Sequence, residues 1–373
     1  MNPELLSRRA AEAGLADVWA KVDAGERLTS GDAVRLFEHE DLALVGAMAD
    51  VVRRRLHGSR AYFNVNQHVN YTNLCNKLCK FCAFQRLPGQ EGAYCMSPEE
   101  AADEIRKKLH EPVTEVHMVA GIWPKLEYGY YLDLLRAVKE ARPSIHVKAF
   151  TMVEIDEIQR VAKKPLDQVL LELKEAGLDS LPGGGAEIFA DRVHQAIFPL
   201  KIGAERWLEI ARTAHRVGLR SNCTMLYGHI ETIEERVDHL ERLRALQDET
   251  GGFQTFIPLS FHPDNSEMAD LPAPTAHDDL RTIAVSRLFL DNVPHVKAYW
   301  IMLGIPTAQL ALNYGADDID GTVTQERIYH DAGAQTPQEL ARADLIRLIV
   351  DAGFEPVERD TLYNVVKVEE IVA

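Results

Sequence analysis

Three of the five cysteines in this 373-residue sequence lie within eight residues of one another, as Cys75, Cys79 and Cys82. Thiolates are the usual ligands of iron–sulfur clusters, and this spacing lets one loop reach three corners of a 4Fe–4S cubane. A structural zinc ion or a fully ligated cluster needs four ligands, so three thiolates leave one iron open. The spacing therefore predicts a 4Fe–4S cluster whose open iron binds a further molecule.

Cys95 offers an alternative, because as a fourth ligand it would complete a zinc site or a closed cluster. Structural zinc sites usually combine two closely spaced cysteine pairs, and the sequence has no second pair. Cys95 also stands two residues before Ser97, where a helix is predicted to begin, and an apolar side chain would serve there as well. We therefore favour three ligands, and we expect Cys223 to be a core residue of a strand.

A run of three glycines, which includes Gly184 and Gly185, follows one of the predicted strands. Glycine has no Cβ, so the backbone there can approach a ligand closely. Glu187 stands two residues further on, where it could accept hydrogen bonds from a ribose. The alternative is a flexible turn with a solvated glutamate. No Lys-Ser or Lys-Thr follows the glycines, which excludes the Walker phosphate motif.

The Cys-x3-Cys-x2-Cys motif, with the aromatic Phe81 directly before its last cysteine, resembles the radical S-adenosylmethionine (SAM) superfamily. The resemblance implies that the amino and carboxylate groups of SAM bind the open iron, and that an electron from the cluster breaks the sulfur–C5′ bond. It also implies that Phe81 lies against the adenine and that Gly121 contacts the methionine moiety. The predicted SAM-binding residues are therefore Phe81, Gly121, Gly184, Gly185 and Glu187.

Further segments resemble the branch of the superfamily that acts in the futalosine route to menaquinone. These segments are 70–75, 80–84, 183–189, 225–232 and 247–253, and segments 298–304 and 313–322 resemble the aminofutalosine synthases of that branch. The resemblance implies that a 5′-deoxyadenosyl radical adds to the methylene carbon of 3-[(1-carboxyvinyl)oxy]benzoate. The aryl group then migrates, carboxylate is lost, and 6-amino-6-deoxyfutalosine and methionine are formed. It further implies that SAM is a cosubstrate and that an external electron donor such as flavodoxin or ferredoxin is needed.

The alternative within this branch is dehypoxanthine futalosine cyclase, in which the radical abstracts a hydrogen atom instead of adding to a double bond. A substrate with two carboxylates also needs hydrogen-bond donors in the site, despite the acidic total charge. Basic side chains near the predicted strands are candidates, and the sequence does not choose among them. They are His68, Lys148, Arg220, His262 and Lys297.

Alternating strands and helices are predicted to position these side chains. Apolar periodicity predicts strands at 62–69, 114–120, 145–150, 178–181, 220–226, 253–259, 296–301 and 317–319. Helices are predicted between them, and the run from Ser97 to Glu100 carries a capping box with proline at the first helical position.

Strands that alternate with helices imply a parallel sheet. About eight such units in roughly 265 residues favour an α/β fold of the (β/α)8 TIM-barrel type. We expect an N-terminal helical extension over residues 1–58, the barrel over 59–325, and a C-terminal extension over 326–373 packed on the barrel, with a helix at 337–353. The cysteines follow the first strand, at the carboxyl end where barrel active sites lie.

The composition limits the expected partners and location. The net charge is −16, with 57 acidic and 41 basic residues, and a nucleic-acid partner is not expected because binding needs a basic face. No stretch of about 18 apolar residues is present, so no membrane span is expected. The N-terminus lacks the basic-then-apolar order of a signal peptide. An odd number of cysteines without such a signal predicts reduced thiols in the cytoplasm.

Overall fold

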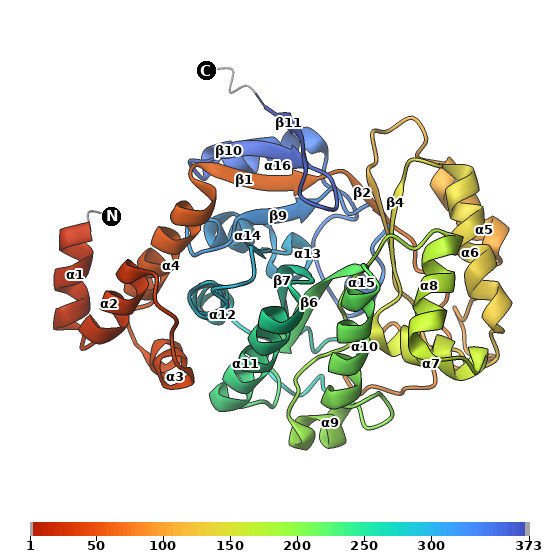
Figure 1. Ribbon diagram of the computed structural model, residues 1–373, viewed down its shortest axis with the longest axis horizontal. Helices are drawn as coiled ribbons and strands as arrows, with labels where there is room; N and C mark the ends of the chain where they lie inside the picture. The colour runs from red at the N-terminus through yellow and green to blue at the C-terminus, as the bar shows by residue number, and fades with distance from the viewer. Residues whose placement is uncertain (1–2, 370–373) are drawn as a thin grey trace.

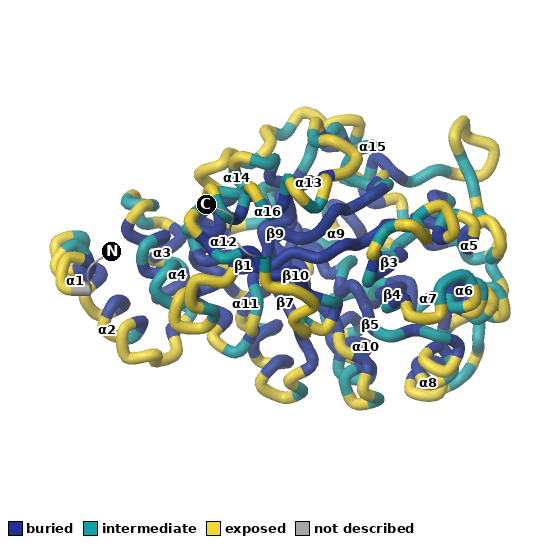
Figure 2. The backbone as a smooth tube through the Cα atoms, turned by 90° about the horizontal axis from the view of Figure 1, so that it is seen from above, coloured by how far each residue is buried: buried dark blue, intermediate teal, exposed yellow. Residues whose placement is uncertain are grey.

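Parallel strands form the centre of the molecule, and helices cover their outer face (Figure 1). The computed structural model describes residues 3–369. In Figure 2 the central strands are buried, whereas exposed residues gather on the surrounding helices and loops. The barrel strands are β1 (Arg60–Asn64), β2 (Asn66–His68), β3 (Glu115–Met118), β4 (His146–Ala149), β5 (Ser180–Leu181), β6 (Arg220–Tyr227), β7 (Phe253–Ser260), β8 (His295–Val296) and β9 (Asp318–Gly321).

The strands close into a ring. Strands β2 to β8 form a seven-stranded parallel sheet in chain order. Beyond β8, Lys297 forms a parallel bridge with Asp318, and the N–H of Ala298 donates to the carbonyl of Asp318 at 2.7 Å. Strand β9 pairs in turn with β1, which runs directly into β2. The predicted (β/α)8 arrangement is thus confirmed, with β9 as the eighth strand.

Helices connect the strands, and the start of α5 agrees with the sequence prediction. Ser97 and Glu100 form the expected capping box of α5, and Gly177 ends α8 with a φ of +123°. The connecting helices are α5 (Pro98–Arg106), α6 (Tyr128–Ala141), α7 (Met152–Ala162), α8 (Leu166–Ala176), α9 (Asp191–Ile197), α10 (Ala204–Arg216), α11 (Ile233–Thr250), α12 (Ala276–Phe289), α13 (Trp300–Leu303), α14 (Ile305–Ala311) and α15 (Ile328–Asp331).

The prediction of a strand over 296–301 is wrong beyond its first residues. Strand β8 ends at Val296, and the chain turns into the short helix α13 at Trp300. Alternating apolar residues suggest a strand here, but the fully buried indole of Trp300 donates to the carbonyl of Gly321 at 2.9 Å. This contact draws the chain across the end of β9. The first predicted strand also differs, because it is divided into β1 and β2.

In Figure 1 the N-terminal helices lie at the left of the barrel, and the C-terminal elements lie at its top. The N-terminal helices are α1 (Pro3–Glu12), α2 (Ala16–Ala24), α3 (Ser30–Glu38) and α4 (Leu42–His57), and the C-terminal elements are α16 (Arg342–Asp351), β10 (Glu355–Arg359) and β11 (Val365–Val368). Helix α4 packs against α12, and β10 pairs in parallel with β1. The helix expected at 337–353 begins only at Arg342. The division of the chain into three segments, with boundaries after residues 58 and 325, stays a prediction. Residues 1–2 and 370–373, at the two ends of these segments, lie outside the described residues.

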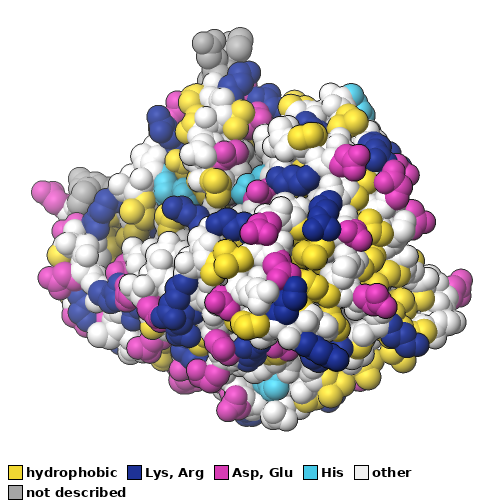
Figure 3. Space-filling view, turned by 45° about the vertical axis from the view of Figure 1, so that its right-hand side comes forward, with side chains coloured by type: hydrophobic (Ala, Val, Ile, Leu, Met, Phe, Trp, Pro, Cys, Tyr) yellow, Lys and Arg dark blue, Asp and Glu magenta, His cyan; other side chains and the backbone are white. Residues whose placement is uncertain are grey.

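The outer surface carries both signs of charge. On the face shown in Figure 3, acidic and basic side chains are interspersed. Among residues 3–369, no helix combines the length and the apolar character needed to cross a bilayer.

Candidate active site

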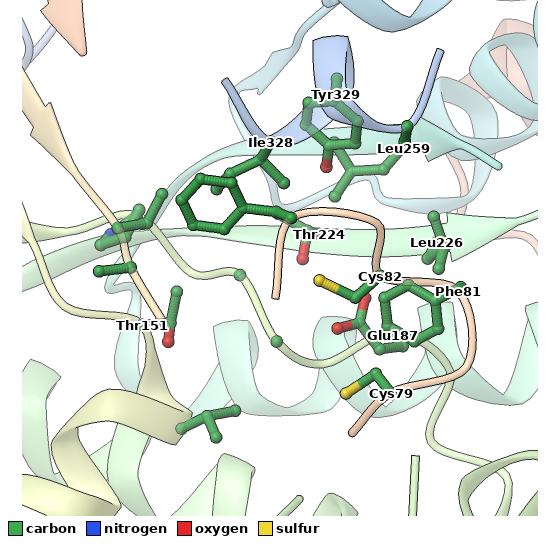
Figure 4. A pocket seen from close by; sticks show the side chains of 18 of the residues that line it. Cys79, Phe81, Cys82, Thr151, Glu187, Thr224, Leu226, Leu259, Ile328 and Tyr329 are labelled. Atoms are coloured by element: carbon green, nitrogen blue, oxygen red, sulfur yellow. The ribbon is translucent and has the colours of Figure 1, made fainter. Parts of the chain in front are cut away.

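A cavity opens at the carboxyl ends of the barrel strands, and the eight site residues predicted from the sequence all line it. Its empty volume, which includes the open mouth, is about 1550 Å³. The predicted residues in its wall are Cys75, Cys79, Phe81, Cys82, Gly121, Gly184, Gly185 and Glu187. In Figure 4 the side chains of Cys79, Phe81, Cys82 and Glu187 gather on one side, opposite Ile328 and Tyr329.

The cysteine loop is held in place by backbone hydrogen bonds to three other segments. The N–H of Cys75 donates to the carbonyl of Arg86 at 3.1 Å, and the N–H of Asn76 donates to Ile122 at 3.0 Å. The N–H of Lys80 donates to Ile197, at the end of α9, at 2.9 Å. The protein therefore shapes this loop through main-chain contacts rather than through the thiols.

The thiols themselves are poised for a ligand that displaces their protons. Burial raises the pKa of Cys79 to about 12 and also raises the pKa of Cys82. A thiol buried in this way becomes a thiolate when a metal binds it. Among the described residues, the one set of three potential ligand atoms within 4.8 Å of one another is His57, His295 and Asp317, near the amino ends of β8 and β9.

The remaining two cysteines lie outside the cavity wall. Cys95 is exposed, and its Sγ contacts the carbonyl of Met96 at 3.9 Å. Cys223 is fully buried on β6, as predicted for a core residue, and its neighbours Asn222 and Thr224 face the cavity instead.

Gly121 allows the chain after β3 to lie directly against the cysteine loop. Its N–H donates to the carbonyl of Thr72 at 2.8 Å. A Cβ at this position would lie 2.3 Å from the carbonyl oxygen of Leu74. Gly185 has a φ of +84°, which side chains rarely adopt, and a Cβ there would lie 2.5 Å from a methyl group of Val153. Both glycines therefore permit close packing around the cavity.

Glu187 is paired with a lysine that the sequence analysis missed. The Nζ of Lys201 forms an ion pair with Glu187 and lies 5.3 Å above the centroid of the Phe81 ring. Both side chains are largely buried. Lys201 is a lone charged residue between Leu200 and Ile202, and this isolation in an apolar stretch was the available signal. The alternative of a solvated Glu187 is thus wrong.

Charged side chains of the strands form another group at the cavity, which we call the strand floor. Lys148 donates to Glu115 at 2.8 Å, Lys297 donates to Asp320 at 3.0 Å, and all four side chains are buried. Of the five carboxylate-binding candidates, His68, His262 and Lys297 line the cavity, whereas Lys148 only touches its wall residue Glu115. Arg220 is exposed at the start of β6 and does not reach the cavity.

The strand floor also contains His117, another residue that the sequence analysis missed. The rings of His68 and His117 stack with centroids 4.6 Å apart and an interplanar angle of 9°. Burial lowers the pKa of both imidazoles, and for His117 the neighbouring His68 lowers it further. Both rings are therefore neutral at ordinary pH.

Two family models together match the chain from residue 69 to residue 372, apart from residues 244–249. The radical SAM superfamily matches residues 69–243, and the CofH/MqnC C-terminal region matches residues 250–372. A relative called aminodeoxyfutalosine synthase, from Thermus thermophilus, is 50% identical over 93% of this chain and 95% of its own. The chain belongs to the radical SAM superfamily. Members of this superfamily use a 4Fe–4S cluster and SAM, and the three thiols in the cavity wall suit that use.

Other members of the radical SAM superfamily extend the comparison. An aminodeoxyfutalosine synthase from Streptomyces coelicolor is 48% identical over 93% of this chain and 92% of its own. A cyclic dehypoxanthine futalosine synthase from Halalkalibacterium halodurans is 38% identical over 93% of each chain. Among solved structures, methylornithine synthase has a TM-score of 0.72 at 19% identity and covers 91% of this chain and 96% of its own. That likeness supports the fold alone.

Proposed function

We propose that this radical SAM enzyme is an aminodeoxyfutalosine synthase. The observation that carries the proposal is the identity of 50% and 48% to two relatives of that name, over 93% of the chain. The relative called cyclic dehypoxanthine futalosine synthase reaches 38% over the same share, so the cyclase is the second candidate.

We propose that Cys75, Cys79 and Cys82 hold the cluster, with SAM on the open iron. When bound, these groups supply a 5′-deoxyadenosyl radical from SAM. Cys95 is exposed and outside the wall, which supports three protein ligands rather than four. Lys201, buried beside the thiols and paired with Glu187, offsets negative charge at this end of the cavity.

The remaining predicted residues then position SAM. Phe81 offers its ring to the adenine, and Glu187 accepts hydrogen bonds from the ribose. Gly184 and Gly185 let the backbone approach the nucleoside, and Gly121 does the same at the methionine end. Aliphatic side chains from β6, β7 and α15 line the cavity and exclude water and stray hydrogen donors. They are Leu226, Ile257, Leu259 and Ile328.

The proposed cosubstrate is 3-[(1-carboxyvinyl)oxy]benzoate. The adenosyl carbon bonds to its vinyl methylene, and the aryl group moves from oxygen to the adjacent carbon. Loss of the enol carboxylate as CO2 or bicarbonate then leaves a ketone and releases one electron, which balances the electron used to cleave SAM. The products are methionine and 6-amino-6-deoxyfutalosine. Holding the vinyl group within contact of the adenosyl carbon is the main task of the cavity, because positioning supplies much of the rate in such a step.

An external donor such as flavodoxin or ferredoxin would supply the electron, in a reducing cytoplasm that keeps the thiols free. Among the described residues all five cysteines are unpaired, which agrees with such a compartment.

Anaerobic incubation of the reconstituted enzyme with SAM and each candidate substrate tests the proposal. The enolpyruvyl benzoate should give one adenosyl–benzoate adduct per methionine. If dehypoxanthine futalosine is consumed instead and 5′-deoxyadenosine is the main nucleoside product, the enzyme is the cyclase.

A further inference from the structure

Two histidines on the strand floor face the cavity without any protein partner for their rings. Strands β2 and β3 pair with His68 directly opposite His117, and paired residues on neighbouring strands point to the same face. Both side chains line the cavity, and His68 is only 6% exposed. No ring nitrogen of either residue makes a hydrogen bond within residues 3–369, although the two rings stack on each other.

Three other histidines of the barrel behave differently. His146 contacts Ser180 at 2.8 Å, His239 contacts the carbonyl of Thr224 at 2.9 Å, and His262 contacts the carbonyl of Met302 at 2.9 Å. Buried polar groups in proteins are nearly always hydrogen-bonded. Two adjacent imidazoles that are free on the cavity side therefore indicate a ligand that supplies the missing partners.

The surrounding charges indicate the chemistry of that ligand. Each floor lysine is already paired, Lys148 with Glu115 and Lys297 with Asp320, so these four side chains carry no net charge. The free groups are the neutral imidazoles, each of which offers one N–H donor. Donors near paired lysines suit a carboxylate, whose oxygens only accept hydrogen bonds.

We propose that His68 and His117 together bind the ring carboxylate of the aromatic substrate. This inference rests on the proposed function, because it uses the two carboxylates of the enolpyruvyl benzoate. The enol carboxylate leaves during the reaction. Strong hydrogen-bond donors to this carboxylate would stabilise it in the substrate and so oppose its loss. The ring carboxylate remains in the product, so firm binding there holds the aryl group as it migrates without opposing the carboxylate loss.

Two unreactive ligands separate the carboxylates experimentally. 3-(1-Carboxyethoxy)benzoate lacks the vinyl group but keeps both carboxylates, and 2-phenoxypropanoate lacks only the ring carboxylate. Calorimetric titration of each into the SAM-loaded holoenzyme measures the preference for the diacid. A hydrogen-bonded charged group is worth about 10- to 100-fold in affinity, and we expect the wild-type enzyme to show a preference of that size.

His68→Phe and His117→Phe keep a flat ring but remove the donor. Each should erase most of the preference for the diacid while leaving the affinity for 2-phenoxypropanoate within about threefold of the wild-type value. The Gln variants restore an N–H donor, and their preference for the diacid should lie between that of the Phe variants and that of the wild-type enzyme. His146→Gln is the matched control, because His146 is a partly buried histidine on the next strand that does not line the cavity. It should retain the full preference.

Three outcomes decide the proposal. Loss of the preference in the Phe variants but not in His146→Gln supports it. The proposal is overturned if the Phe variants keep the preference for the diacid, or if the wild-type enzyme shows no such preference. If a Phe variant takes up no iron, the Gln variant at the same position is judged by the same criterion. A wild-type enzyme that prefers the diacid but forms no adduct from the vinyl substrate would instead reject the proposed function and leave the binding site in place.

Discussion

The cysteine loop and the strand floor contribute to one cavity, but they are built in opposite ways. The loop spans residues 75–82, is shaped by main-chain hydrogen bonds, and presents thiols that have no structural task. The floor is drawn from β2, β3, β4 and β9 and from Lys297 directly after β8, and its lysines and carboxylates form buried ion pairs. The difference indicates that the loop contributes to the chemistry but little to the stability of the fold, whereas the floor contributes to both.

The largest effect is expected at the loop. Cys79→Ala should abolish adenosyl transfer and leave almost no iron and sulfide after anaerobic reconstitution, because two thiolates cannot retain the cluster. The free energy of unfolding of the cluster-free protein should change by only about 1 kcal/mol. Elemental analysis and urea unfolding measure the two quantities. Full iron content in this variant would remove Cys79 from the ligand set.

A substitution in the strand floor should lower the stability of the fold but leave the iron content unchanged. Lys148→Met leaves the buried carboxylate of Glu115 without its partner and should cost about 3–5 kcal/mol in unfolding free energy. Iron content per folded molecule should stay at the wild-type level. The double variant with Glu115→Gln should recover much of the lost stability, since no unpaired charge then remains. A stability cost below 1 kcal/mol would contradict the view that the floor is a structural element.

A smaller effect is expected where the two regions meet. Tyr71, between β2 and the loop, donates to Glu154 at 2.7 Å, and burial raises the pKa of Glu154 to about 7. A carboxyl whose pKa is higher in the folded state stabilises the fold below its unfolded pKa, and this contribution is lost as pH rises through the folded value. Between pH 5 and pH 8 the unfolding free energy of the cluster-free protein should fall by about 2–3 kcal/mol, and the Glu154→Gln variant should not show this fall. Urea unfolding at both pH values tests this, and equal pH dependence in the two proteins would contradict it.

The smallest effect is expected at Cys95, and it tests whether three or four cysteines bind the cluster. Cys95→Ser should leave iron, sulfide and adduct formation unchanged, because Cys95 is exposed and does not line the cavity. Loss of cluster in this variant would mean that four cysteines close the site. Cys223→Ser is a poor control, since Cys223 is fully buried.

The same contrast explains how much could be predicted from the sequence. The cysteines are neighbours in the chain, so their spacing is visible, and the capping box at Ser97 and the alternating strands predicted the barrel. His68 and His117 stand about fifty residues apart and meet only through the register of β2 and β3. No local pattern carries that information, and for the same reason Glu115 was missed. The strand expected beyond Val296 failed because a tertiary contact of Trp300 overrides the local pattern.

The central claim is that the adenosyl group of SAM becomes part of the product. Incubation of the reconstituted enzyme with SAM labelled with ¹³C at C5′ and the enolpyruvyl benzoate tests it most directly. The account predicts that NMR finds the label in the benzoate-containing product, bonded to the former vinyl methylene carbon. Label recovered in 5′-deoxyadenosine, with a hydrogen atom taken from the substrate, would contradict it.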